Sequence, residues 1–237
     1  MSDKYTIETV HTPQPKLNRN DLLQVMKYRY ATKKWDPNKK ISDADFNAIL
    51  EAGRLSPTSF GFEPYQMIIL QDKDLRQAIK PHAWGAQNAL DNASHMVVFL
   101  AHKKEDITFG SAFLDHMTKE VQSLPDDVYK FYGQAYNNFS KNDFKTLESD
   151  RTAFDWSAKQ CYIVMANMMV MAAYQGIDSC PIEGFVPAEL DRILGKEAGL
   201  YDVSRMGIAC MTAFGYRDEL PHRDKTRRPL SESVQWK

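Results

Sequence analysis

Residues 155–175 constrain the fold more than any other stretch, because their side chains are apolar almost all the way round a helix. A helix of this composition has no face suited to water, so it lies in a protein core or between two subunits. Gly176 follows it and accepts the left-handed conformation that commonly ends a helix. The most apolar part, residues 161–173, is interrupted by Asn167 and is shorter than the ~20 residues that span a bilayer. The pattern therefore predicts a buried helix and no membrane span.

The composition allows one sizeable core and argues against several classes of partner. The chain has 237 residues, 43% of them hydrophobic, and a formal net charge of −1, which gives no overall attraction to nucleic acid or anionic membranes. Cys161, Cys180 and Cys210 form neither an even disulfide set nor a closely spaced metal pair. We therefore expect a reducing, cytoplasmic location and no metal site. Residues 1–16 hold charges and two prolines, unlike a secretory signal.

The spacing of apolar residues divides the chain into helices and strands. Helices are predicted from Asn20 to about Arg29, from Ser42 to about Leu55, after Asp72, and from Pro187 to Leu194, and strands over 65–70, 94–101, 177–180 and 204–214. The strand over 94–101 is continuously apolar, which indicates a central position with both faces buried.

Residues 108–150 have a helical but polar pattern and carry a band of aromatic side chains. This band either forms a mobile lid over a site or packs a pair of inserted helices together. Its members are Tyr129, Phe131, Tyr132, Tyr136, Phe139 and Phe144.

The segment 180–185 predicts an ordered, irregular turn. Pro181 fixes its own φ, and Gly184 lets the backbone approach a ligand without a Cβ in the way. The backbone N–H groups of Glu183 and Gly184 can then face a flat hydrogen-bond acceptor such as an aromatic heterocycle. The alternative is a plain connection after a buried helix.

A second loop, residues 56–65, combines two prolines, a glycine and three hydroxyl side chains, so it is either a ligand-holding loop or a cap before a strand.

Cationic clusters lie near both ends of the chain. Arg29, Lys225 and Arg227 can neutralise a phosphate monoester if the fold brings the two ends together. Otherwise these cations complement a helix dipole at one end and are solvated at the other.

Four motifs occur together in one order: Arg29-x-x-x-Lys33, Ser56-Pro57-Thr58-Ser59-x-x-x-x-Pro64-Tyr65, Pro181-Ile182-Glu183-Gly184-Phe185 and Lys225-x-Arg227. In this order the chain resembles the nitroreductase family, in particular the oxygen-insensitive bacterial enzymes that use FMN and NAD(P)H. The resemblance covers most of the chain. It implies an α+β fold with a central mixed, mainly antiparallel sheet flanked by helices, in an interlocked homodimer with FMN at the subunit interface. Residues 1–237 would form one such domain, with a helical insertion at about 108–150.

The resemblance also implies roles for individual residues. Phosphate-binding positions of the family fall on Arg29, Lys225 and Arg227, and Lys33 falls beside the pyrimidine edge of the flavin, where a positive charge would stabilise the anionic reduced form. The remaining cofactor positions are Tyr30 and Ala31 near the phosphate side, Pro57, Thr58, Ser59 and Gly61 in the loop from the neighbouring subunit, Pro181 and Ile182 against the ring, and the N–H groups of Glu183 and Gly184 toward flavin N5 and O4. Phe60 is expected to form a wall of the substrate pocket.

Some positions depart from the family pattern. Tyr30 and Ala31 replace polar residues, and Gly61 and Glu63 replace an Asn and a Gln that are common in the loop. The positions that hold the pyrimidine edge fall on Ala86 and Ala89, which leaves Gln87 or Asn88 as the substitute.

The expected activity is ping-pong hydride transfer from NADH or NADPH to a nitroaromatic, a quinone or a related small-molecule acceptor, with no side-chain nucleophile. A flavin, dihydropteridine or enone reductase, and a catalytically silent FMN-binding dimer, remain open alternatives. Cys180 is either a redox thiol or a small buried hydrophobe.

Overall fold

The computed structural model describes residues 5–7, 9, 12–16 and 18–237. The expectation about a secretory signal falls partly on residues outside these ranges. The helices are α1 (Arg19–Tyr28), α2 (Asp43–Arg54), α3 (Lys73–Ile79), α4 (Gln87–Asn92), α5 (Ala112–Asp115), α6 (Asp126–Asn138), α7 (Asp150–Tyr174), α8 (Pro187–Leu190) and α9 (Leu230–Ser233), and the strands are β1 (Tyr65–Ile69), β2 (His95–His102), β3 (Asp178–Ile182) and β4 (Met206–Gly215). Short 3-10 turns cover Ser59–Gly61 and Lys80–His82, and π-helical segments cover His116–Val121, Phe139–Asp143 and Asp191–Glu197.

The four strands form one sheet in the order β1-β2-β4-β3, and every neighbouring pair is antiparallel. The strand with the continuous apolar run, β2, lies inside the sheet, as its sequence predicts. Its partner β4 matches it in register from His95–Phe214 to His102–Met206, with one irregularity between Phe99 and Leu100. Within the described residues the only parallel pairing is an isolated bridge between Ala31 and Ser179. The α+β class is confirmed.

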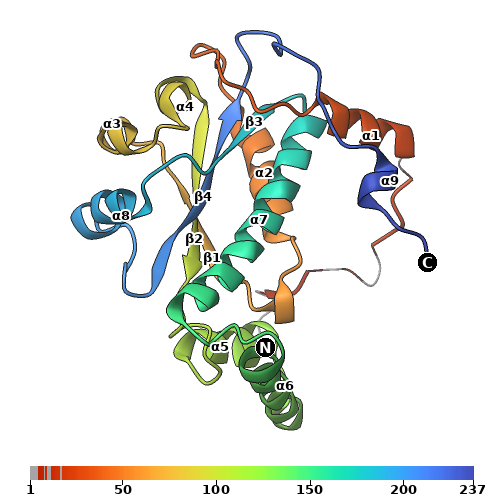
Figure 1. Cartoon of the computed structure of the whole chain (residues 1–237), viewed down its shortest axis with the longest axis vertical. Helices are drawn as coiled ribbons and strands as arrows, with labels where there is room; N and C mark the ends of the chain where they lie inside the picture. The colour runs from red at the N-terminus through yellow and green to blue at the C-terminus, as the bar shows by residue number, and fades with distance from the viewer. Residues whose placement is uncertain (1–4, 8, 10–11, 17) are drawn as a thin grey trace.

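Helices cover both faces of the sheet (Figure 1). On one side α2 and α7 pack over a cluster that contains Val97, Phe99 and Phe214. On the other side α3, α4 and α8 cover a cluster that contains Met96, Val98 and Met211. Because alternate residues of β2 enter the two clusters, both faces of this strand are buried.

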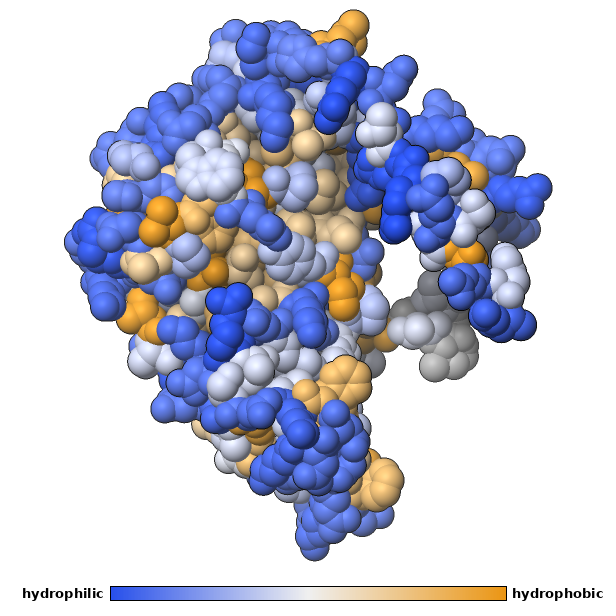
Figure 2. Space-filling model, viewed as in Figure 1, coloured by the Kyte–Doolittle hydropathy of each residue, from blue (hydrophilic) through white to orange (hydrophobic). Residues whose placement is uncertain are grey.

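The central helix α7 begins with a capping box between Ser149 and Thr152, and Gly176 follows it with φ of +73°. One side of α7 packs on the sheet, while Ile163 and Tyr174 on the helix are 40% and 63% exposed. Figure 2 shows apolar and weakly apolar residues along this face, bordered by hydrophilic ones. The polar interruption, Asn167, donates to the hydroxyl of Ser56 at 2.8 Å.

Three members of the aromatic band, Tyr132, Tyr136 and Phe139, pack in a third cluster, which also contains Phe62 and Trp156. Tyr136 is fully buried, and its hydroxyl donates to the carbonyl of Ile107 at 2.6 Å. Phe131 and Phe144, in contrast, are about 70% exposed. Half of the band therefore packs the helices together.

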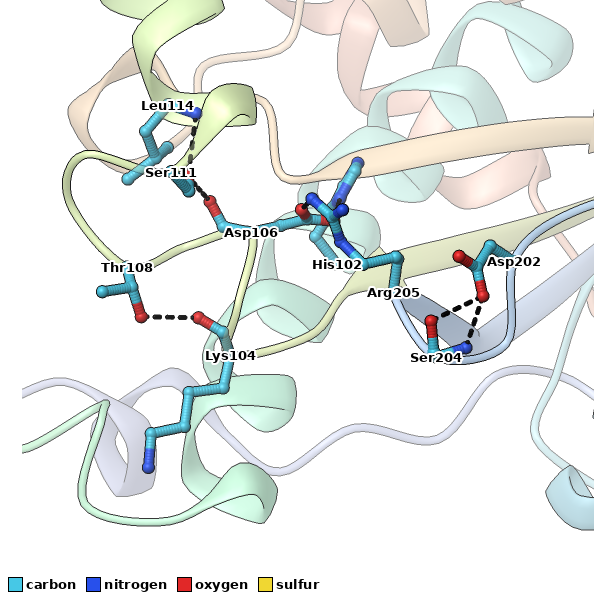
Figure 3. Close-up of polar contacts among 9 residues, drawn as sticks. All are labelled: His102, Lys104, Asp106, Thr108, Ser111, Leu114, Asp202, Ser204 and Arg205. Atoms are coloured by element: carbon cyan, nitrogen blue, oxygen red, sulfur yellow. Dashed lines mark hydrogen bonds and ion pairs between the residues drawn. The ribbon is translucent and has the colours of Figure 1, made fainter.

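A buried polar cluster ties the start of the helical segment to the sheet (Figure 3). Asp106 is only 2% exposed, forms an ion pair with Arg205, and lies 2.6 Å from Nδ1 of His102. Burial and the nearby Arg205 lower the pKa of His102 to about 4. The Asp106 carboxylate favours the protonated ring, but its charge is shared with Arg205, so burial decides the direction.

Several predicted boundaries were wrong. The cap of α1 is Asn18, whose side chain accepts from the N–H of Asn20, so the helix begins before Asn20. Strand β3 continues beyond Cys180 through Pro181 and Ile182. Proline fits there because β3 is an edge strand, where its missing N–H removes no ladder bond. The caps at Ser42 and Asp72 are confirmed.

Candidate functional site

The fold brings the two cationic ends of the chain together. Residues after α1 run beside the end of β4: Trp35 bridges Arg217, and the N–H of Asp36 donates to the carbonyl of Tyr216 at 2.9 Å. Arg217 also forms an ion pair with Asp178, which is 3% exposed. These contacts place Arg29 next to the segment that follows β4.

A cavity of about 290 Å³, called the basic cavity below, lies where these segments meet. It holds four cations and one carboxylate. Its lining is Met26, Arg29, Tyr30, Ala31, Met169, Pro181, Arg223, Asp224, Lys225, Thr226 and Arg227. The structure therefore gathers Arg29, Tyr30, Ala31, Pro181, Lys225 and Arg227, which the sequence singles out.

The basic cavity contains a hydrogen-bond donor that no acceptor of the described residues satisfies. Nε of Arg29 is enclosed and has no hydrogen-bond partner within the described residues. Burial, together with the charges of Arg29, Arg227 and Arg217, lowers the pKa of Lys225. A cluster of cations that disfavours the charged form of one of its own lysines is typical of an anion-binding site.

Lys225 also contacts the C-terminal end of helix α1. Its ammonium donates to the carbonyls of Met26 and Lys27, at 2.8 and 2.6 Å, and so satisfies the end of α1. An ammonium has three donors, so one remains for a ligand. The sequence suggests that cations just after α1 complement the dipole of this helix. In the structure Lys225, from the other end of the chain, has this role.

The end of β3 leads from the basic cavity to a second one. Pro181 borders both, and the second cavity, of about 350 Å³, is lined by Tyr162, Met165, Pro181, Ile182, Glu183 and Cys210. The Tyr162 hydroxyl donates to the Glu183 carboxylate. A further cavity of about 570 Å³ begins at this pair and extends along α7 and β4.

The turn after β3 keeps the two N–H groups that the sequence predicts. The N–H groups of Glu183 and Gly184 donate to no carbonyl or side chain in the described part of the chain. Gly184 packs backbone to backbone against Gly85, whose N–H donates to the Gly184 carbonyl at 2.7 Å. A Cβ on Gly184 would lie 2.8 Å from Cα of Gly85. Glycine is required here for this close approach.

Lys33 lies on the other side of the same strand end. It lines a cavity of about 190 Å³ together with Trp84, Gln87 and Asn88, and its Nζ is 3.5 Å from Sγ of Cys180. The Gln87 amide nitrogen donates to the carbonyls of Lys80 and Ala83, and the Asn88 side-chain oxygen accepts from the N–H of Trp35. Both remain candidates for the pyrimidine edge, whereas Ala86 and Ala89 are buried in the core.

The loop that contains Pro57, Thr58, Ser59, Phe60 and Gly61 lines none of these cavities. Its backbone is held from within the chain: Gln160 accepts from the N–H of Ser59, and Tyr132 donates to the carbonyl of Phe60 at 2.6 Å. The Phe60 ring packs in the aromatic cluster of α6. A single chain therefore does not bring this loop to the basic cavity.

Sequence reasoning missed some residues of the site. Arg223 lies two positions before Lys225 and four before Arg227, and every residue from 223 to 227 lines the cavity. The density of cations in this short segment was a usable signal. The contacts of Met169 and Tyr162 carried no such signal, since both positions look like ordinary members of an apolar helix.

Within the described ranges, no three His, Cys, Asp or Glu side chains are grouped as metal ligands. No helix of that part is long and apolar enough to cross a membrane.

The family model described as "Nitroreductase family" matches residues 26–216. The chain belongs to the nitroreductase family. A Bacillus subtilis member named "Putative NAD(P)H nitroreductase YfkO" is 46% identical over 218 residues, which cover 92% of this chain and 98% of that protein. A Staphylococcus epidermidis member, "Putative NAD(P)H nitroreductase SERP2086", is 41% identical over 215 residues, or 91% and 96% of the two chains.

Solved structures of nitroreductase-family proteins share the fold. An Exiguobacterium sibiricum protein described as "a putative nitroreductase in complex with FMN" superposes with a TM-score of 0.71 at 18% identity, covering 95% of this chain and all of that chain. At this level of identity the likeness establishes the common α+β architecture alone.

Proposed function

We propose that this nitroreductase-family protein is an FMN-dependent oxidoreductase that takes a hydride from NADH or NADPH and passes it to a nitroaromatic, quinone or related acceptor. The observation that carries the proposal is that the basic cavity and a second cavity share Pro181, while the N–H groups of Glu183 and Gly184, at the end of the same strand, have no partner among the described residues. A cationic end and an amide-lined end suit a flat ring system that bears a phosphate.

The basic cavity fits a phosphate monoester by charge and by donors. The cations Arg29, Arg223, Lys225 and Arg227 outnumber the single carboxylate, Asp224. A monoester dianion would compensate most of this excess, and the unpartnered Nε of Arg29 would gain an acceptor. Arg29, Lys225 and Arg227 would hold the phosphate, with Tyr30 and Ala31 beside it.

The strand end would hold the ring. Pro181 and Ile182 would pack against it, the N–H groups of Glu183 and Gly184 would donate to its N5 and O4 edge, and Lys33 would lie at the pyrimidine edge. Bound FMN would supply the acceptance and donation of hydride. The chain's own residues would position the ring, exclude water from one face, and compensate the negative charge that develops on reduction. No side-chain nucleophile is needed, and alternating hydride transfer through one site gives ping-pong kinetics.

A homodimer would complete the site, with Pro57, Thr58, Ser59, Gly61 and Phe60 supplied by the second copy. The exposed apolar surface of the single chain supports this. Helix α1 has no buried residue, and its Leu22, Leu23 and Met26 are 49%, 56% and 41% exposed. Such surface on α1 and along α7 is typical of an interface. The three cysteines are free, which supports work in a reducing compartment such as the cytoplasm.

The test begins with purified protein. We expect a bound yellow flavin that NADH or NADPH bleaches in the absence of oxygen and that a quinone or nitroaromatic restores. A flavin that is bound but never bleached would identify a silent binding protein, and failure to take up added FMN would refute the proposal.

Arg227→Ala tests the phosphate site directly. Loss of one charge-assisted hydrogen bond, of about 1.5–3 kcal/mol, should weaken FMN binding roughly 10- to 150-fold. Arg228→Ala is the matched control, because this neighbouring arginine is exposed and lies outside the basic cavity. Titration of the FMN-free proteins with FMN measures both. Equal affinities in the two variants would contradict the assignment.

A further inference from the structure

The ammonium of Lys33 has a sulfur atom as its hydrogen-bond partner. Its Nζ lies 3.5 Å from Sγ of Cys180, and no carboxylate pairs with Lys33 in the part of the chain that the structure describes. The lysine is exposed at the edge of the 190 Å³ cavity that Trp84, Gln87 and Asn88 also line. A cation so placed would ordinarily be solvated and mobile, since a lysine side chain has several rotatable bonds.

The sulfur, in contrast, is held rigidly. Cys180 lies inside β3, is paired in register with Ala213, and is 3% exposed. Burial raises the pKa of its thiol despite the nearby ammonium. The protonated thiol donates weakly to the carbonyl of Pro181 at 3.6 Å, which leaves a sulfur lone pair for Lys33. A fixed acceptor therefore lies beside a flexible cation.

We propose that Cys180 is a positioning residue: its sulfur holds the Lys33 ammonium at the edge of the cofactor site. This inference rests on the proposed function, because it assigns the held ammonium the task of compensating charge on reduced FMN. A lysine that is already held in place loses less side-chain entropy when it interacts with the negative charge on the reduced flavin. Cys180 thus acts through Lys33 and touches neither substrate.

The first test is the midpoint potential of bound FMN in a double-mutant cycle of Cys180→Ala and Lys33→Met. Loss of one weak hydrogen bond should weaken binding of reduced FMN relative to oxidised FMN by up to about fivefold, and so lower the potential. Lys33→Met should lower it further. In the Lys33→Met background, Cys180→Ala should have no additional effect, because the group that it positions is gone.

An equal shift in both backgrounds, or an unchanged potential in Cys180→Ala, would overturn the proposal. Cys180→Ser is the conservative variant: its hydroxyl can accept from the ammonium, so it should retain the wild-type potential. A serine variant that behaves like the alanine variant would also count against positioning by the residue-180 acceptor.

The second test needs no cofactor. Reductive methylation of the FMN-free protein, followed by mass spectrometry of peptides, should modify Lys33 faster in Cys180→Ala than in the wild type. Lys34 is the internal control, because it pairs with Glu219 at 2.9 Å and should react equally in both proteins. Unchanged labelling of Lys33 would show that the sulfur does not hold it. If wild-type protein binds no FMN, the proposed function fails, while this labelling result still decides whether the contact exists.

Discussion

The contact between Gly85 and Gly184 offers a sharp test of the turn that would face the flavin. In Gly184→Ala the new Cβ would lie 2.8 Å from both N and Cα of Gly85 and 2.9 Å from Cε3 of Trp84. Two of these atoms belong to the backbone, so no side-chain rotation relieves the clash, and the two segments must separate.

The expected cost follows from what this separation breaks. Overpacking of a tight contact costs about 1–3 kcal/mol. The hydrogen bond from the Gly85 N–H to the Gly184 carbonyl adds about 1 kcal/mol if it is lost. We therefore expect Gly184→Ala to lower the free energy of unfolding by about 2–4 kcal/mol. It should also weaken FMN binding, because the N–H groups of Glu183 and Gly184 move.

Urea unfolding of the FMN-free protein and FMN titration are the two assays. Gly85→Ala should have a similar effect, since its Cβ would lie 2.9 Å from Cα of Gly184, and the double variant should cost less than the sum, because one separation serves both. Gly207→Ala is the control: its Cβ would meet only side chains, at 3.1 Å or more. Wild-type stability in Gly184→Ala would refute the contact, and reduced stability with unchanged FMN affinity would refute the role of the turn.

Two further predictions concern the buried polar cluster of Figure 3. Asp106→Asn removes the buried counter-ion of Arg205, whose side chain is 39% exposed, and should lower the free energy of unfolding by about 1.5–3 kcal/mol, as for the loss of a charge-assisted hydrogen bond. Asp127→Asn, at an exposed position of α6, should change it little, and thermal unfolding compares the two variants. Because the pKa of His102 falls to about 4 on folding, the unfolded chain binds the extra proton, so stability should fall by about 3 kcal/mol as pH decreases from 6.5 to 4. Urea unfolding should show a flatter pH profile in His102→Gln, and an identical profile would contradict a buried neutral ring.

Local sequence patterns determined much of the architecture. Ser42 and Asp72 cap helices because a side-chain oxygen within a few residues satisfies free N–H groups, a relation that depends on neighbours in the chain. The continuous apolar run in β2 required burial of both faces, which a central strand provides. The motif order was likewise enough to indicate the family.

Only the tertiary structure decided which distant residues meet. The path of residues 31–36 beside β3 and the end of β4 brings Arg29 to Arg227, and the packing of the connecting segments around β3 brings Lys33 to Cys180 and Gly85 to Gly184. The packing of the Phe60 loop against Tyr132 of α6 is likewise a contact between residues far apart in the sequence. Periodicity reports which face of an element is buried and leaves open what covers that face. Contacts between residues far apart in sequence arise from the packing of whole elements, so the amino-acid pattern supplied the parts of this site and the fold supplied their arrangement.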